Sequence, residues 1–412
     1  MLCPSIYDKI LYQTENTGIC LSRKGDLIAK GEMTVSHTEN KRIQGETKRP
    51  VKKKKESTAR RVLRTLGRIL LLVLETLLLI CIALYGIMYV LAKGPSVTAR
   101  NMFVSSVRET SAIKFLANIY FTPEEIAVIE SVREMEEYAP TDTSLINIDV
   151  DHSTTVSKEG WTDAHGVFHP DEDGDGIIIE PVKGTGYSGY MMVVEDPSRV
   201  ILGSIPSSYG REGYVLSEYV QHYDGVAGTN AGGFYDPGGM GDGSIPDSVV
   251  VVEGQIYYME YGCGTEGGGG IAAIDGNHIL HVARSMTRQE IIDNDIRYAV
   301  CYGPVLINNG VPTPEDSLIV SLNPRTAIGQ CADGAMLFLV IDGRQVVSMG
   351  ARYQDLVEIM QRYGAVNAVN LDGGSSSMLW FKDHYVNNSS SVIGVRDMPT
   401  SFVILKEGAN NG

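Results

Sequence analysis

Residues 367–380 read NAVNLDGGSSSMLW, and the rest of the sequence is best understood from this stretch. The short apolar run 365–371 predicts a buried strand. Asp372 ends the run, and it is followed by two glycines, which permit backbone angles that other residues resist, and three serines. Several hydroxyls and free amides around one carboxylate suit a sugar or a phosphate oxygen. Taken alone, the DGGS tetrapeptide is equally typical of a polar hairpin turn.

The sequence before this loop predicts a helix. Residues 352–363 carry apolar side chains at helical spacing, and Gly364 stands where a C-cap glycine belongs. A helix, a buried strand and an acid–glycine–serine loop therefore follow one another closely. This order favours a built site over an isolated turn.

Four short motifs occur in the order known from one protein family. They are NAGGF at 230–234, YGPVLI at 302–307, PRTAIG at 324–329 and NLDGGSS at 370–376. Together with GYSGYMMVVEDPSRV at 186–200, they make residues 187–405 resemble the phosphodiester glycosidases. That family includes the enzyme that uncovers mannose 6-phosphate, and bacterial proteins labelled as exopolysaccharide-related. Ser375 departs from the pattern, since many members have a third glycine there; we expect a tighter loop with unchanged chemistry.

A hydrophobic segment lies well before these motifs. Residues 69–92 contain a single charged side chain, Glu75. A helix of that length spans roughly 36 Å, which is enough for a bilayer. Residues 41–68 carry twelve Lys and Arg against two Glu, so the positive-inside bias predicts a cytoplasmic N-terminus and an extracellular remainder. A cleaved signal peptide is the alternative, but an apolar core this long is more typical of an uncleaved anchor.

The N-terminal tail, residues 1–68, is predicted to be cytoplasmic and is basic from residue 41. Residues 1–40 show no convincing periodicity, and a translation start at Met33 is one hypothesis. Nucleic-acid binding is a common interpretation of a basic run. Because an apolar segment follows directly, we expect a lipid bilayer as the partner and no nucleic acid. The protein is thus expected to be a single-pass protein of the cell membrane.

The remaining sequence predicts a stalk at 93–140 and a body at 141–412. In the stalk, Thr122 and Glu125 fit a capping box. Short, glycine-punctuated strands with few helices make the body α+β, with a mainly antiparallel or mixed sheet. The strands are expected at 189–195, 248–258, 271–274, 297–300, 335–341 and 401–405, and the helices at 217–223, 288–294 and 352–363.

An acidic loop in the body is similar to the start of a calcium loop. Asp171, Asp173 and Asp175 occupy its first, third and fifth positions, with glycine at the sixth. The twelfth position is Val182 rather than glutamate, so the bidentate ligand is missing unless Glu180 replaces it in an irregular loop. An acidic turn is the alternative. Calcium is accordingly a candidate ligand of this loop. The expected reaction itself requires no cofactor.

Several other patterns lack the sequence context that their usual function requires. Residues 262–267 match GxGxxG, but a strand rather than a helix is expected next, which excludes a dinucleotide site. The sequence has no GxSxG, P-loop or HExxH spelling. His165 and His169 are four apart in a Gly- and Asp-rich loop, where satisfied or exposed histidines are commoner than zinc ligands. One disulfide and one spare thiol, with the pairing open, are expected among Cys263, Cys301 and Cys331.

The motifs contain the residue types that phosphodiester chemistry needs. The Asn230 amide suits a sugar hydroxyl or a phosphate oxygen, and the Arg325 fork matches two phosphate oxygens. An ordinary turn asparagine and a surface ion pair are the respective alternatives. Asp372 is the acid of the strongest motif, and the resemblance implies that these segments meet. The expected catalytic residues are Asp372, Arg325 and Asn230, and the expected substrate-binding residues are Gly232, Gly233, Thr326, Gly373, Gly374, Ser375 and Ser376.

The resemblance implies hydrolysis of a sugar 1-phosphodiester at the anomeric carbon–oxygen bond, as by an N-acetylglucosamine-1-phosphodiester alpha-N-acetylglucosaminidase. Glycosidases normally use two carboxylates, but a phosphomonoester leaves as a stabilised anion, so positive charge can replace most of the general acid. Weak candidates for a second carboxylate are Asp236, Asp242 and Glu260. The expected substrates are sugar phosphates or glycopolymers of the envelope. A non-catalytic glycopolymer-binding protein or a scaffold in polysaccharide export remains the alternative.

Overall fold

The computed structural model describes residues 57–110, 113–131, 138–148, 159–237, 242–259, 269–391 and 394–408. The chain divides into two compact units at Leu71 and Leu72, and each is described by itself. Most of the predicted tail, the GxGxxG match at 262–267, Glu260 and Cys263 lie outside the described residues.

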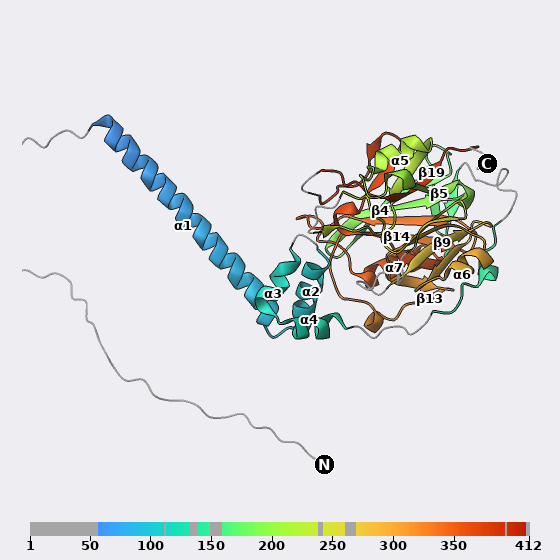
Figure 1. Ribbon diagram of the computed structural model, residues 1–412, viewed down its shortest axis with the longest axis horizontal. Coiled ribbons are helices and arrows are strands. Elements are labelled where there is room, and N and C mark those ends of the chain that lie inside the picture. The colour runs from blue at the N-terminus through green and yellow to red at the C-terminus, as the bar shows by residue number, and fades with distance from the viewer. Residues whose placement is uncertain are drawn as a thin grey trace, which may run out of the picture. The chain divides into compact units, whose positions relative to one another are not determined.

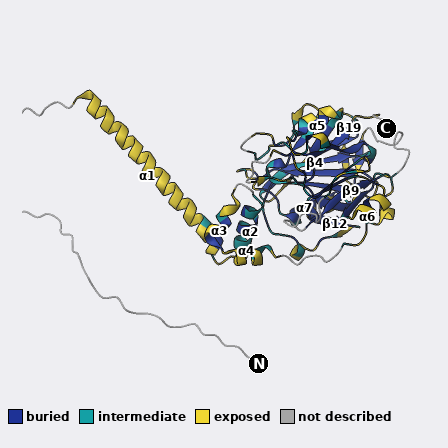
Figure 2. Cartoon of the chain, viewed as in Figure 1, coloured by how far each residue is buried: buried dark blue, intermediate teal, exposed yellow. Residues whose placement is uncertain are grey.

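Helix α1, Thr58–Lys93, contains the predicted apolar segment and extends beyond it at both ends. It has no proline, and its leucine-rich sequence favours a helix. Its large apolar side chains are exposed almost throughout, as the yellow ribbon in Figure 2 shows. Among the described residues it is the one helix long and apolar enough to cross a membrane.

Short helices follow α1 and share a small apolar core, which includes Ala92 at the end of α1. They are α2 Val97–Arg108, α3 Ala117–Tyr120 and α4 Pro123–Glu130. We call α2, α3 and α4 together the helical segment. The predicted capping box is present: Thr122 accepts from the Glu125 backbone, and Glu125 accepts from the Thr122 backbone. This cap places the start of α4 where local sequence alone predicts it.

The body is built from antiparallel sheets (Figure 1). The seven-stranded sheet has the order β13-β12-β16-β14-β15-β4-β3. A five-stranded sheet has the order β18-β17-β6-β19-β5, and another has the order β10-β9-β11-β7-β8. The predicted α+β class with mainly antiparallel sheet is therefore confirmed.

The strand bounds of the seven-stranded sheet are β3 Ile177–Gly184, β4 Tyr187–Val194, β12 Val305–Asn308, β13 Val311–Pro312, β14 Arg325–Cys331, β15 Met336–Ile341 and β16 Ala365–Asn370. Those of the two five-stranded sheets are β5 Val200–Ser204, β6 Gly225–Asn230, β17 Leu379–Phe381, β18 His384–Tyr385 and β19 Thr400–Leu405, and then β7 Val249–Val252, β8 Gln255–Met259, β9 Ile271–Asp275, β10 Leu280–Ala283 and β11 Ile296–Cys301. The hairpin of β1 Gly160–Thr162 and β2 Phe168–Pro170 stands apart.

The central strands of the seven-stranded sheet are buried on both faces. In β15, Leu337 and Leu339 pack with α7, Tyr353–Arg362, while Phe338 packs on the opposite side. Side chains alternate between the faces of a strand, so an unbroken apolar run such as MLFLVI fits a strand covered on both sides. The Phe338 ring lies 5.7 Å from that of Phe402 in β19, which joins two sheets through one core. The other body helices are α5 Leu216–His222 and α6 Arg288–Asp293.

One predicted strand is wrong. Residues 248–258 form the hairpin β7–β8 rather than a single strand. Glu253 and Gly254 have φ values of 51° and 78°, and a two-residue turn with both φ angles positive reverses the chain. The apolar residues on either side conceal this turn in the sequence.

The cysteine arithmetic is only partly decided. Cys331 is a free, buried thiol that donates to the carbonyl of Tyr363, which makes it a spare thiol. Because Cys263 lies outside the described residues, the predicted disulfide stays a prediction.

Candidate active site

Three predicted motifs meet at the ends of β6, β14 and β16. Strand β14 pairs with β16 and places Ala327 opposite Asn370. The Leu371 amide donates to Thr326 O at 2.8 Å, and the Asp372 amide donates to Ala231 O at 3.0 Å. Strand pairing within one sheet and a backbone hydrogen bond to the segment after β6 therefore bring together segments that the resemblance only implied to be close.

Asn230 fixes the position of the Asp372 loop. Its side chain is 1% exposed, and its Nδ2 donates to Asp372 O at 2.6 Å. Its Oδ1 accepts from Thr326 Oγ1 at 2.8 Å and from Met378 N at 3.1 Å. The polar atoms of Asn230 and the Thr326 hydroxyl hydrogen are thus used within the protein. The arrangement makes both residues supports of the loop that carries Asp372.

The glycines of the two motifs allow close packing around this loop. Gly374 has a φ of 63°, and its amide donates to Pro324 O at 2.9 Å. A Cβ on Gly373 would lie 2.8 Å from the same carbonyl oxygen. Gly232 donates to Thr400 Oγ1 at 3.1 Å, and a Cβ on Gly233 would lie 2.8 Å from the Tyr302 ring. At both pairs of glycines, the absence of a side chain therefore lets neighbouring groups pack directly against the backbone.

The Asp372 carboxyl is partly exposed but surrounded by protein. Burial raises its pKa from 3.8 to about 7. Hydrogen bonds from the Ser376 side chain and the Gly373 amide, the latter at 2.9 Å, oppose the rise in pKa, as does the charge of Arg396. A carboxyl that titrates near neutral pH can take up and release a proton during a reaction.

Arg325 is held in an ion pair. It is 3% exposed, and its Nη2 lies 2.9 Å from Glu109 Oε2, just beyond the end of α2. The same nitrogen donates to Ser321 Oγ at 2.7 Å, and the guanidinium stacks 3.8 Å from the centre of the Tyr353 ring. The structure therefore places a carboxylate of the chain itself against Arg325. Binding of substrate phosphate by Arg325 stays a prediction.

Two arginines that sequence reasoning missed lie beside the loop of Asp372. Arg396 Nη1 donates to Ser375 Oγ at 3.3 Å, and its Nη2 pairs with Asp236 Oδ1 at 3.1 Å. Arg344 is exposed, and its Nη2 is 3.2 Å from where a Cβ on Gly374 would be. Neither arginine belongs to one of the four motifs. Each reaches the loop through a long side chain from a distant segment, and such a contact cannot be recognised from neighbouring residues in the sequence.

The weak candidates for a second carboxylate lie in different surroundings. Asp236 pairs with Arg396, and its charge raises the pKa of Asp372, so the two acids are electrostatically coupled. Asp242 instead accepts from the Ser244 amide at 3.1 Å within its own loop. Of these two described acids, Asp236 is the one placed at the site.

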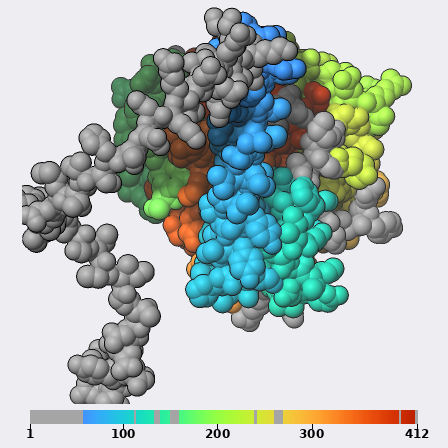
Figure 3. All heavy atoms as spheres, turned by 90° about the vertical axis from the view of Figure 1, so that its left-hand side faces the viewer, coloured from blue at the N-terminus to red at the C-terminus, as the bar shows by residue number. Residues whose placement is uncertain are grey.

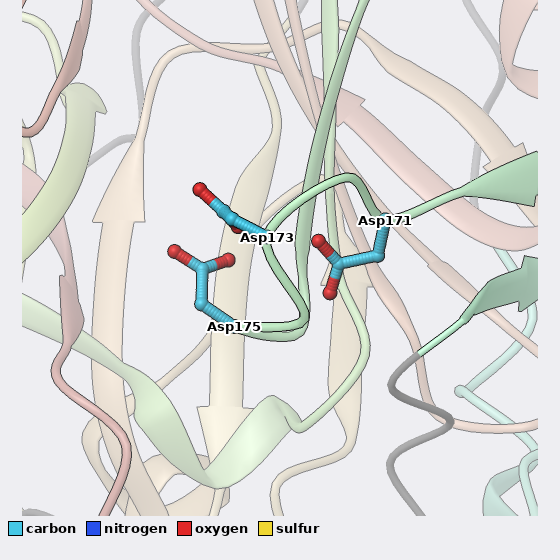
Figure 4. Close-up of side chains that lie close together, drawn as sticks. All are labelled: Asp171, Asp173 and Asp175. Carbon is cyan, nitrogen blue, oxygen red and sulfur yellow. The ribbon is translucent and has the colours of Figure 1, made fainter.

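The acidic loop brings its three carboxylates together, within 4.8 Å of one another (Figure 4). Asp171 accepts from the amides of Gly174 and Gly176, and the Lys382 ammonium pairs with Asp173. Strand β3 begins at the seventh loop position, so the chain is extended where a calcium loop would continue around its ion.

Glu180 contacts other groups. Its Oε2 lies 3.1 Å from His169 Nδ1, and its Oε1 accepts from the Tyr363 hydroxyl. A twelve-residue calcium loop therefore does not fit this segment. Calcium binding by Asp171, Asp173 and Asp175 alone stays a prediction.

Comparison with known proteins identifies the class of the domain. Residues 223–405, a little under half of the chain, match the phosphodiester glycosidase family, which confirms the resemblance seen in the motifs. The chain is 32% identical over 123 residues to the SPbeta prophage-derived uncharacterized protein YomE of Bacillus subtilis. That match covers 29% of this chain and 19% of the relative, so the chain spans less than a fifth of its length.

Two solved structures are also similar to the chain, at low identity. The zebrafish N-acetylglucosamine-1-phosphodiester alpha-N-acetylglucosaminidase catalytic domain, auto-inhibited by its pro-peptide, has a TM-score of 0.45 at 16% identity. The match covers 67% of this chain and 96% of the zebrafish chain. A protein of Synechocystis has a TM-score of 0.40 at 14% identity, with 55% of this chain and 61% of that chain covered.

Proposed function

We propose that the protein hydrolyses sugar 1-phosphodiesters at the anomeric carbon–oxygen bond, with Asp372 as the central catalytic residue. The observation that carries the proposal is one carboxyl, titrating at about pH 7, at the end of a strand inside a phosphodiester glycosidase domain. A group with this pKa is suited to general base catalysis at neutral pH. Two arginines beside its loop, Arg344 and Arg396, suit an anionic leaving group.

The reaction can be written with these residues. The ionised Asp372 carboxylate accepts a proton from a water molecule as the water oxygen bonds to the anomeric carbon. The carbon–oxygen bond to phosphate breaks, and its electron pair leaves with the phosphomonoester. Arg344 and Arg396 stabilise the negative charge on phosphate, which replaces most of the protonation that a poorer leaving group needs. The proton held by Asp372 then passes to the phosphomonoester or to water.

We place this activity outside the cell, on a membrane anchor. The support is the apolar helix α1, preceded by a basic run. An outward-facing enzyme near the membrane meets the phosphodiester-linked glycans of the envelope, so these are the proposed substrate class. The sugar is taken as N-acetylglucosamine for the first assay.

A binding protein that has lost turnover is the second candidate. The observation that favours it is the ion pair between Arg325 and Glu109, because a carboxylate of the chain already pairs with the guanidinium that was expected to bind substrate phosphate. Such a protein would bind sugar phosphodiesters without releasing product. If the protein only binds its ligand, the raised pKa of Asp372 has no catalytic role.

The test uses the full-length chain in detergent with an N-acetylglucosamine 1-phosphodiester in ¹⁸O-labelled water. We expect free sugar that carries the label, because water attacks the anomeric carbon. Label in the phosphate would show cleavage of the phosphorus–oxygen bond and would contradict the proposed chemistry. Binding of the phosphodiester with no free sugar would favour the second candidate.

A further inference from the structure

The C-terminal end of α2 contributes a carboxylate to the body. Glu109, the C-cap residue of α2, pairs with Arg325 at 2.9 Å. Its Oε1 accepts from Ser321 Oγ at 2.7 Å, and its Oε2 accepts from Asn323 Nδ2 at 2.8 Å. Three donors from one short stretch of the body therefore converge on a single carboxylate. Figure 3 shows residues 97–110 and 113–130, cyan to teal, on the face turned to the viewer.

Two neighbours of Glu109 make further polar contacts with the body. Ser106 Oγ accepts from the Leu322 amide at 2.8 Å, and Thr110 Oγ1 accepts from Arg344 Nη2 at 2.9 Å. The apolar side chains of the helical segment instead form their own core. Directional hydrogen bonds of this kind specify position, because they weaken steeply when their geometry changes.

The stretch held by Glu109 also supports the catalytic loop. Pro324 O accepts from the Gly374 amide at 2.9 Å, and Thr326 O accepts from the Leu371 amide at 2.8 Å. Residues 321–326 therefore lie between Glu109 and the loop of Asp372. A shift of this stretch moves the catalytic carboxyl.

The ion pair between Glu109 and Arg325 strengthens the contact between α2 and residues 321–326. Arg325 is 3% exposed, and Glu109 provides its carboxylate partner. Removing one member of a buried ion pair leaves an uncompensated charge, which is strongly destabilising to its surroundings. Without Glu109, we expect Arg325 and the stretch from Ser321 to rearrange toward water or another anion.

We propose that Glu109 is a positioning residue of the active site, so that the end of α2 belongs to the catalytic unit. This inference rests on the proposed function. It also revises the predicted body boundary at residue 141, because a chain that starts there lacks Glu109. The carboxylate acts through residues 321–326 and does not touch the substrate.

The experiment compares Glu109→Ala and Glu109→Gln with the wild type in the full-length chain. We expect kcat of Glu109→Ala to fall about a hundredfold with KM within a fewfold, the scale of a misplaced catalytic group. Sodium acetate should raise kcat of Glu109→Ala at least tenfold, because a small carboxylate can occupy the space left by the Glu109 side chain. It should restore little in Glu109→Gln, whose uncharged amide fills that space.

Glu130→Gln is the matched control. Glu130 pairs with Arg108 at 3.0 Å within the same helical segment, so this variant removes an ion pair without touching the body. Turnover of the control should stay within twofold of wild type. A Glu109→Ala protein that is faster than wild type would overturn the proposal and show that α2 obstructs the site. A folded Glu109→Ala protein with unchanged kcat would overturn it as well.

A readout independent of turnover separates this inference from the proposed function. Hydrogen exchange of the Gly374 amide should be faster in both Glu109 variants, unchanged in Glu130→Gln, and slowed again by acetate in Glu109→Ala. If the wild type releases no sugar, the proposed function fails while the exchange data still test the positioning role. Unchanged exchange in a folded Glu109→Gln protein would overturn it.

Discussion

Two acidic, glycine-containing loops in this protein have opposite surroundings. The loop at Asp372 follows a buried strand, and its partners come from segments far away in the chain, such as Asn230 and Thr326. The loop at Asp171 satisfies its carboxylates with its own amides and one exposed lysine. The first loop is therefore held by distant segments of the chain, whereas the second is held mainly by its own backbone amides.

The two loops also differ in their electrostatics. Burial raises the pKa of Asp372 to about 7, whereas in the acidic loop the hydrogen bond with Lys382 lowers the pKa of Asp173 and burial raises that of Asp175. Both loops are candidate sites when judged by their sequence motifs alone. The comparison therefore predicts large effects of substitution at the first loop and small effects at the second.

The largest effect is expected for Asp372→Asn. The substitution keeps size but removes the base, so turnover should fall by at least about a hundredfold, the usual scale for a lost general base. Binding of the anionic phosphodiester should change little or tighten, because a negative neighbour is gone. Steady-state kinetics and binding of a non-hydrolysable analogue measure the two effects. Turnover of Asp372→Asn within a fewfold of wild type would show that Asp372 is not the catalytic base, and that its loop is no more important for activity than the acidic loop.

Arg344→Ala should come next. Hydrogen bonds to charged groups contribute about 1.5–3 kcal/mol, so KM should rise roughly tenfold to a hundredfold if Arg344 binds phosphate. Arg344→Lys should recover part of the loss, since an ammonium lacks the two-pronged fork. An unchanged KM for Arg344→Ala would assign phosphate binding to other arginines.

The raised pKa of Asp372 predicts an opposite pH dependence of activity and stability. Activity should rise through about pH 7 as the base ionises. Between about pH 4 and 7 the folded protein holds a proton that the unfolded chain has lost, so this carboxyl makes stability fall as pH rises, by at most about 1.4 kcal/mol per pH unit. Denaturant titrations of wild type and Asp372→Asn across this range should differ in slope. Parallel curves would mean an ordinary carboxyl.

The smallest effects are expected at the acidic loop. Asp173→Asn breaks an exposed pair with Lys382, and such pairs contribute at most about 1 kcal/mol. Turnover should stay within twofold of wild type, and chelation of divalent cations should leave it unchanged. Thermal unfolding with and without calcium provides the sharper measurement. A rise of several degrees with calcium, lost in Asp173→Asn, would make this loop a real cation site.

Much of the fold is readable from local sequence. The capping box at Thr122, the apolar length of α1 and the C-cap glycine after α7 are each set by neighbouring residues, and each is found where it was predicted. Gly364 indeed has a φ of 80°. The hairpin at residues 253–254 is missed because apolar residues flank its short turn on both sides.

The candidate site was only half visible for a related reason. Asp372 and its glycines form one continuous motif, so the sequence by itself determined which acid and which loop to examine. Which arginine faces that loop was decided by the tertiary structure, since Arg344 and Arg396 reach it from other loops. Glu109 lies over two hundred residues from Arg325 in the chain, and only folding turns that separation into a contact of 2.9 Å. Backbone conformation follows from neighbouring residues, whereas the environment of a charge follows from what packs around it.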